Sequence, residues 1–136
     1  MLGLHDTFFK IVLGVDIITL IIGIVCIVLS RRSADANTEA TTGTLAQPLR
    51  IFRIALWVTE GIGVLQAIFG VLLLSSGKNP SEPLHFVYGF IVVGAIPIAY
   101  VYSDQKDVRR DVIIMTIATF LIVGAAIRAY ATGGAA

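Results

Sequence analysis

Residues 8–30 read FFKIVLGVDIITLIIGIVCIVLS, a run of 23 residues in which only Lys10 and Asp16 carry a charge. A helix needs about 20 mostly apolar residues to cross the hydrocarbon core of a bilayer. This run has that length. Because backbone amides in lipid must be paired within their own segment, we expect it to form a transmembrane helix.

Three further apolar runs follow, at residues 51–74, 84–102 and 112–130. The chain has 136 residues, of which 57% are hydrophobic and 14% charged. A soluble domain of this size cannot bury so much apolar surface, so lipid is the expected solvent. The sequence predicts an all-α integral membrane protein, a single four-helix transmembrane domain over residues 1–136 with a cytoplasmic loop at 31–50. Nothing in it suggests nucleic-acid binding.

The basic residues predict the orientation, because cytoplasmic loops carry an excess of Lys and Arg. Three lie on the side of the termini: Lys10, Lys78 and Arg128. Seven lie on the other side: Arg31, Arg32, Arg50, Arg53, Lys106, Arg109 and Arg110. We therefore expect both termini on the outer side, in the cytoplasmic membrane of a prokaryote.

Two acidic residues, Asp16 and Glu60, lie inside the expected helices. Ionisable groups in a span are costly and need partners or a function. Each lies on a stripe with a helical spacing that should face other protein: Asp16, Thr19, Gly23, Cys26 and Ser30 on the first helix, and Glu60, Gly63, Ala67 and Gly70 on the second. From sequence position we expect the two carboxyl groups at different depths, each hydrogen-bonded within the bundle or part of a proton or quinone path.

The only two histidines, His5 and His85, each begin a helix at the outer surface. Two imidazoles at matched depth on separate helices are what bis-histidine ligation of a b-type haem (haem b) requires. Lys10 and Arg128 are expected at the same level, where haem propionates could pair with them. Tyr88 and Gly89 follow His85 by about one turn. The alternative is that these residues are interfacial anchors without a ligand.

The stretch LQAIFG at 65–70, the turn with Pro80 and Pro83, and the pair Leu84-His85 resemble part of the haem A synthase family. In that family a helix with a Leu-Gln-x-x-x-Gly pattern leads through a proline-bearing turn to a haem-ligating histidine. The resemblance implies a four-helix, cytochrome b-like, haem-holding bundle with His85 and His5 as axial ligands.

The chain departs from the family where catalysis would lie. Leu2 replaces the acidic residue three positions before the first histidine, and the outer-loop cysteine pair is absent, since Cys26 is the only cysteine. We therefore expect no haem A synthase activity.

Three functions stay open. The first is a haem-bearing subunit of electron-transfer machinery. The second is a cofactor-free accessory subunit that packs against other subunits of a larger respiratory or photosynthetic complex, or against copies of itself. The third is a small-solute carrier built around Asp16, Glu60 and Gln66.

Overall fold

The computed structural model describes the backbone of residues 2–36, 39–103 and 106–133, and side chains at 7–32, 45–103 and 106–133. It contains four helices, α1 (Leu2–Ala36), α2 (Glu39–Ser75), α3 (Leu84–Tyr102) and α4 (Val108–Thr132). Each includes a segment long and apolar enough to cross a membrane: Thr7–Arg32, Leu45–Ser75, Leu84–Tyr102 and Val108–Thr132. The predicted four-helix membrane protein is thus confirmed.

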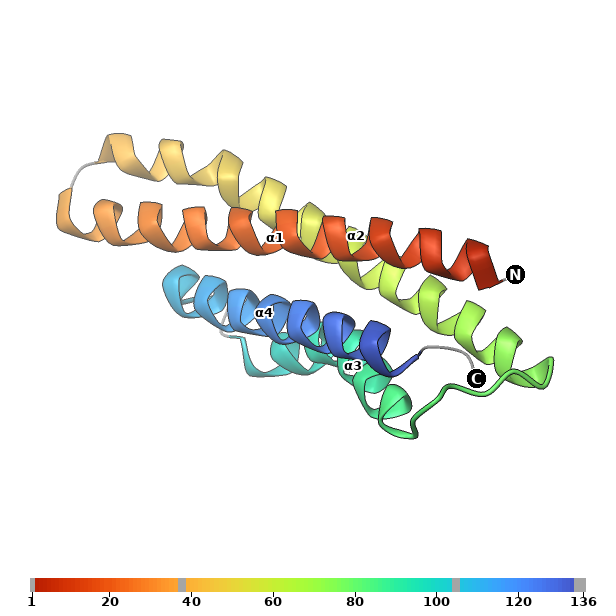
Figure 1. Ribbon diagram of the computed structural model, residues 1–136. Helices are drawn as coiled ribbons and strands as arrows, with labels where there is room; N and C mark the ends of the chain where they lie inside the picture. Colours follow the sequence, from red (N-terminus) through yellow and green to blue (C-terminus); the bar gives the residue numbers. More distant parts are fainter. Residues whose placement is uncertain (1, 37–38, 104–105, 134–136) are drawn as a thin grey trace.

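The start of α1 and the end of α4 lie at the same end of the bundle, here called the terminal end (Figure 1). The opposite end, called the basic end (Figure 1), carries seven basic residues: Arg31, Arg32, Arg50, Arg53, Lys106, Arg109 and Arg110. Helix α4 packs along both α1 and α3, and α1 packs along α2, whereas α2 and α3 touch over a shorter length. Helices α1 and α4 therefore each pack along two neighbours and form the middle of the bundle.

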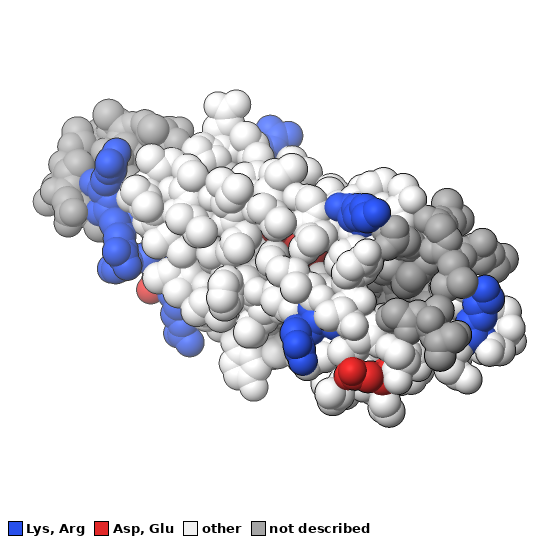
Figure 2. All heavy atoms as spheres, in the orientation of Figure 1, with Lys and Arg blue, Asp and Glu red and all other residues white. Residues whose placement is uncertain are grey.

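The interior combines apolar side chains such as Phe52 and Ile122 with small and polar ones, and many large apolar side chains also cover the outside. The predicted α1 stripe is buried at all five of its positions, including Cys26 and Thr19. By contrast, Trp57 is 68% exposed, and Phe90 and Val101 are each 79% exposed. Figure 2 shows a mainly uncharged band across one face, with Lys and Arg toward its two ends. This distribution suits helices that are packed by close backbone approach and surrounded by lipid.

The expected loop at 31–50 is wrong as a description of the backbone. Helix α1 continues to Ala36 and α2 already begins at Glu39, so only residues 37–38, which lie outside the described part, separate them. The segment 39–47 contains Glu, Ala, Leu and Gln, which favour a helix, and no proline before Pro48. Polarity excludes this segment from lipid, but it does not stop the helices from extending into water.

Two boundaries have clear local causes. Helix α2 ends in a Schellman motif, in which Lys78 N–H donates to Leu73 O and Gly77 N–H donates to Leu74 O. Gly77 supplies the positive φ of 81° that this motif needs. Helix α4 begins four residues before the predicted apolar run because the Asp107 side chain caps it, accepting from Arg110 N–H at 3.1 Å.

Candidate functional site

His85 sits in the first turn of α3 and faces the last turn of α4. Its Nδ1 lies 2.9 Å from the carbonyl oxygen of Ala129. A carbonyl only accepts, so Nδ1 must carry the proton and donate it. The half-buried ring is thereby fixed in orientation, and the lone pair of its Nε2 is left for another partner.

This contact also completes the end of α4. The last four carbonyls of a helix have no intrahelical donor. His85 satisfies that of Ala129, and the Ser81 hydroxyl donates to Thr132 O at 2.8 Å. A methyl group on Gly133 would lie only 2.8 Å from His85 Nδ1, so the ring and the helix end are in close contact. Sequence reasoning missed this capping role, because it depends on which carbonyl the histidine meets.

The other predicted haem-site residues are partly brought together. Arg128 is exposed, and its guanidinium carbon lies 5.8 Å from the centre of the half-buried Tyr88 ring. Gly89 faces open space, since a methyl group there would meet nothing within 4 Å. Lys10 is exposed on α1. The side chain of His5 lies outside the described residues.

A second group of polar residues lies between α1 and α2, near the middle of the spans. The hydroxyl oxygens of Thr19 and Thr59 are 2.9 Å apart, and both residues are buried. Asp16, one turn from Thr19, is 1% exposed, and its Oδ2 has no hydrogen-bond partner. The half-buried Glu60 likewise has a buried Oε2 with no partner.

The expectation that Asp16 and Glu60 lie at different depths is wrong. The Thr19–Thr59 contact fixes the register of α1 against α2. At about 1.5 Å per residue, Asp16 lies about 4.5 Å from Thr19 toward the terminal end, and Glu60 about 1.5 Å from Thr59 in the same direction. The two carboxyl-bearing residues therefore lie within about 3 Å of the same height along the helices. Sequence position alone failed because α2 extends further beyond the apolar core than α1 does.

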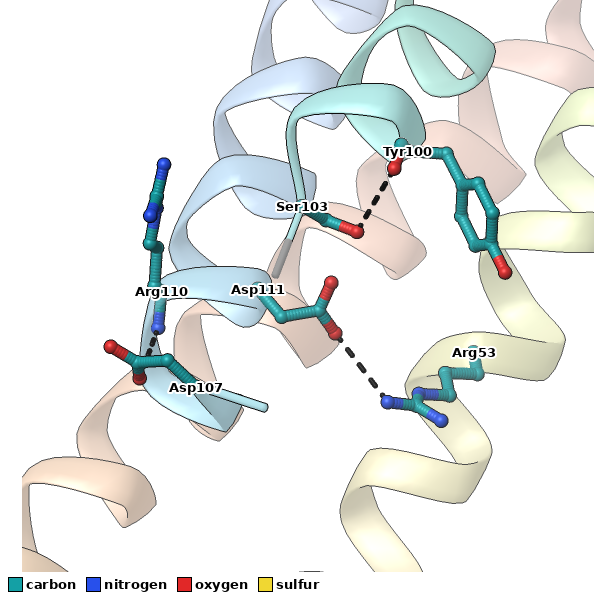
Figure 3. A network of polar contacts seen from close by, with 6 residues as sticks. All are labelled: Arg53, Tyr100, Ser103, Asp107, Arg110 and Asp111. Carbon is teal, nitrogen blue, oxygen red and sulfur yellow. Dashed lines mark hydrogen bonds and ion pairs between the residues drawn. The ribbon is translucent and has the colours of Figure 1, made fainter. Parts of the chain in front are cut away.

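A cleft of about 340 Å³ opens between α2, α3 and α4, toward the basic end. Arg53 Nη2 on α2 lies 3.5 Å from Asp111 Oδ2 on α4, and both residues line the cleft (Figure 3). Glu60 lines it too, as do Trp57 and Tyr100, whose rings lie 6.5 Å apart. Asp111 was missed in the sequence because it directly precedes the fourth apolar run and resembles a flanking charge.

Pro97 lies inside α3 and also lines the cleft. A proline within a helix lacks a donor and clashes with the carbonyl four residues earlier, which bends or weakens the helix there. A second hollow of about 600 Å³ between α3 and α4 is almost entirely apolar, as a lipid-facing groove would be. Neither hollow is lined by His85.

The described side chains that could bind a metal ion are not clustered. Within the described ranges, no group of three or more His, Cys, Asp or Glu residues could hold one. Cys26 is buried in the core cluster beside Phe52 and Ile122. Comparison with protein-family models, with curated proteins and with solved structures found no match to this chain. No relative therefore identifies it as a haem A synthase or a cytochrome b, and any function must rest on its own residues.

Proposed function

We propose that this integral membrane protein is a small subunit of electron-transfer machinery that holds a b-type haem near its terminal end. The observation that supports the proposal is the hydrogen bond from His85 Nδ1 to Ala129 O at 2.9 Å. Histidines that ligate metals almost always donate their other ring N–H to a carboxylate, carbonyl or water. His85 has that arrangement, with Nε2 as the ligating atom and His5 as the second ligand.

The residues around His85 have matching roles in this proposal. The α4 carbonyl orients the imidazole, and Arg128, held beside Tyr88, offers a positive charge for a propionate. Lys10 offers a second charge from α1. Gly89 leaves room beside α3, since no atom lies within 4 Å of the position its methyl group would take. Bound haem would supply one-electron transfer, and these residues would hold and orient it.

The same proposal includes the orientation. Seven Lys and Arg residues at the basic end against three at the terminal end favour a cytoplasmic basic end. The haem would then lie close to the outer surface of a prokaryotic cytoplasmic membrane. Cysteine-scanning with a membrane-impermeant thiol reagent in intact cells checks this, and labelling from outside at residue 78 supports it.

The test of ligation is a visible absorption spectrum of the purified protein, with variants that separate ligation from helix capping. His85→Asn keeps an N–H donor for Ala129 O but removes the imidazole. Ser81→Ala removes a second side-chain cap of α4, the hydroxyl that donates to Thr132 O, without touching a ligand. We expect a Soret band in the wild type and in Ser81→Ala, and its loss or a change to a high-spin form in His85→Asn. An unchanged spectrum in His85→Asn, or no haem in the wild type from haem-replete cells, would refute the proposal.

A cofactor-free accessory subunit is the second candidate, and one observation favours it. The His85 ring already has a complete structural role as a cap of α4, and it lines neither described hollow. This reading predicts a colourless protein that migrates with larger subunits on native gels after mild solubilisation. Recovery as a free monomer under those conditions would count against it.

A further inference from the structure

Asp16 lies in the buried interface between α1 and α2, and no ion pair to its carboxyl group is found among the described side chains. It is 1% exposed, and its Oδ2 has no hydrogen-bond partner. Lys10, Arg53 and Arg128 lie near the ends of the apolar runs, and the central stretches 11–30, 54–74, 84–102 and 112–127 contain no Lys or Arg. On α1 itself the cation next to Asp16 in the sequence is Lys10, six residues or about 9 Å away along the helix toward the terminal end.

The groups that face Asp16 from the neighbouring helices are also uncharged or acidic. On α1 and α2 they are the paired hydroxyls of Thr19 and Thr59, and Glu60 follows Thr59 in the chain at about the same height as Asp16. A methyl group on Gly23 would lie 2.5 Å from Thr116 Oγ1, which sets the register of α4 against α1. Since α1 and α4 run in opposite directions, Asp16 lies opposite the α4 residues near position 123, where residues 112–127 contain no ionisable group.

An ionised carboxylate here has a high energetic cost. Insertion scales give about 2.5–3.5 kcal/mol for a charged residue at the centre of a span. Ionising Glu60 as well, within about 3 Å in height, would add repulsion between like charges. A bound proton removes this cost, because a neutral carboxylic acid needs only a polar neighbour.

We propose that Asp16 is a proton-binding site in the middle of the membrane, which exchanges its proton through Glu60 with the cleft between α2, α3 and α4. The proton leaves the carboxylic acid of Asp16 and joins the carboxylate of Glu60, so the total charge of the pair is unchanged. Glu60 lines the cleft and releases the proton to water there. The Thr19–Thr59 pair supplies the polar surroundings for the transfer. This site is separate from the histidine at the terminal end and does not depend on haem.

Infrared spectroscopy tests the protonation directly, because only a protonated carboxyl group gives a free-acid carbonyl stretch. We expect that band at pH 7 in the reconstituted wild type, and we expect it to shift when aspartate is labelled with carbon-13. It should be lost in Asp16→Asn, which keeps size and polarity, and retained in Asp111→Asn. A wild type without an aspartate acid band, or an Asp16→Asn variant that retains it, would overturn the proposal without requiring any variant to be active.

Hydrogen–deuterium exchange distinguishes an Asp16 that releases its proton from one that keeps it permanently. After transfer to D₂O, the Asp16 band of the folded wild type should shift as O–H becomes O–D. In Glu60→Gln this shift should slow by at least about a hundredfold, the lower end of what a positioned acid–base group contributes to proton transfer. A wild-type band that never shifts would make Asp16 purely structural, and an equal rate in Glu60→Gln would exclude the route through the cleft.

Discussion

Replacing Gly23 with alanine should destabilise the bundle by crowding the point where α1, α2 and α4 meet. The added methyl carbon would lie 2.5 Å from Thr116 Oγ1 and 2.9 Å from Phe52 Cε2. Neither neighbour can easily move. The Thr116 hydroxyl is bonded to Val112 O at 2.7 Å, and the Phe52 ring is buried at 2% exposure. Overpacking of this kind costs about 1–3 kcal/mol.

Gly14→Ala is the matched control, because it lies on the same helix and its methyl group would meet nothing within 4 Å. Both changes gain the same helix propensity, up to about 1 kcal/mol, so that gain cancels in the comparison. Gly23→Ala should therefore be less stable than Gly14→Ala by about 1–3 kcal/mol, or roughly 5- to 150-fold in the unfolding equilibrium constant. Reversible unfolding in mixed micelles, followed by circular dichroism, measures the difference.

Adding Thr116→Ala should relieve part of the crowding in Gly23→Ala but destabilise the wild type. The relief is partial because the Phe52 contact at 2.9 Å remains. The two substitutions should thus be coupled in a double-mutant cycle. Equal stability of Gly23→Ala and Gly14→Ala, with no coupling to Thr116, would refute the packing described for these three helices.

Substitutions at three other positions test single structural features by the same unfolding assay. Thr59→Val removes the hydrogen bond to Thr19 and should cost about 0.6 kcal/mol, the average for such bonds between membrane helices; no loss would mean that the bond adds nothing to stability. Asp111→Asn breaks the ion pair to Arg53, whose side chain is 56% exposed, so the loss should stay below about 1 kcal/mol and shrink at high salt. Gly77→Ala should cost about 1–2 kcal/mol because its φ is 81°, whereas Gly77→Asn should cost less; equal effects would argue against the Schellman motif.

The four spans could be predicted from the sequence because lipid imposes a length and a composition on each helix. The third was placed at its observed bounds, Leu84–Tyr102. The extra turns at the basic end could not be found in the same way, since hydropathy reports where lipid ends and not where a helix ends. Only the Asp107 cap offered a local signal for the true start of α4.

The candidate sites were harder to predict, because a side chain's role depends on the helix it meets. The buried α1 stripe with Asp16 followed from helical periodicity and is confirmed. The hydrogen bond between Thr19 of this stripe and Thr59 could not be predicted, because periodicity gives a face but not the register of one helix against another. The contact of His85 with Ala129 depends in turn on how far α4 extends at the terminal end.

The haem and proton proposals can be checked against each other because they lie on different parts of the bundle. The register set by Gly23 and Thr116 places Asp16 near position 123 of α4, about six residues or 9 Å along the helix from the carbonyl that His85 contacts. Substitutions at that separation with no shared partner usually act independently. His85→Asn should therefore leave the aspartate infrared band unchanged, and Asp16→Asn should leave any haem spectrum unchanged. Loss of both signals in either variant would instead mean that the bundle itself had been disrupted, which circular dichroism on the same samples would show.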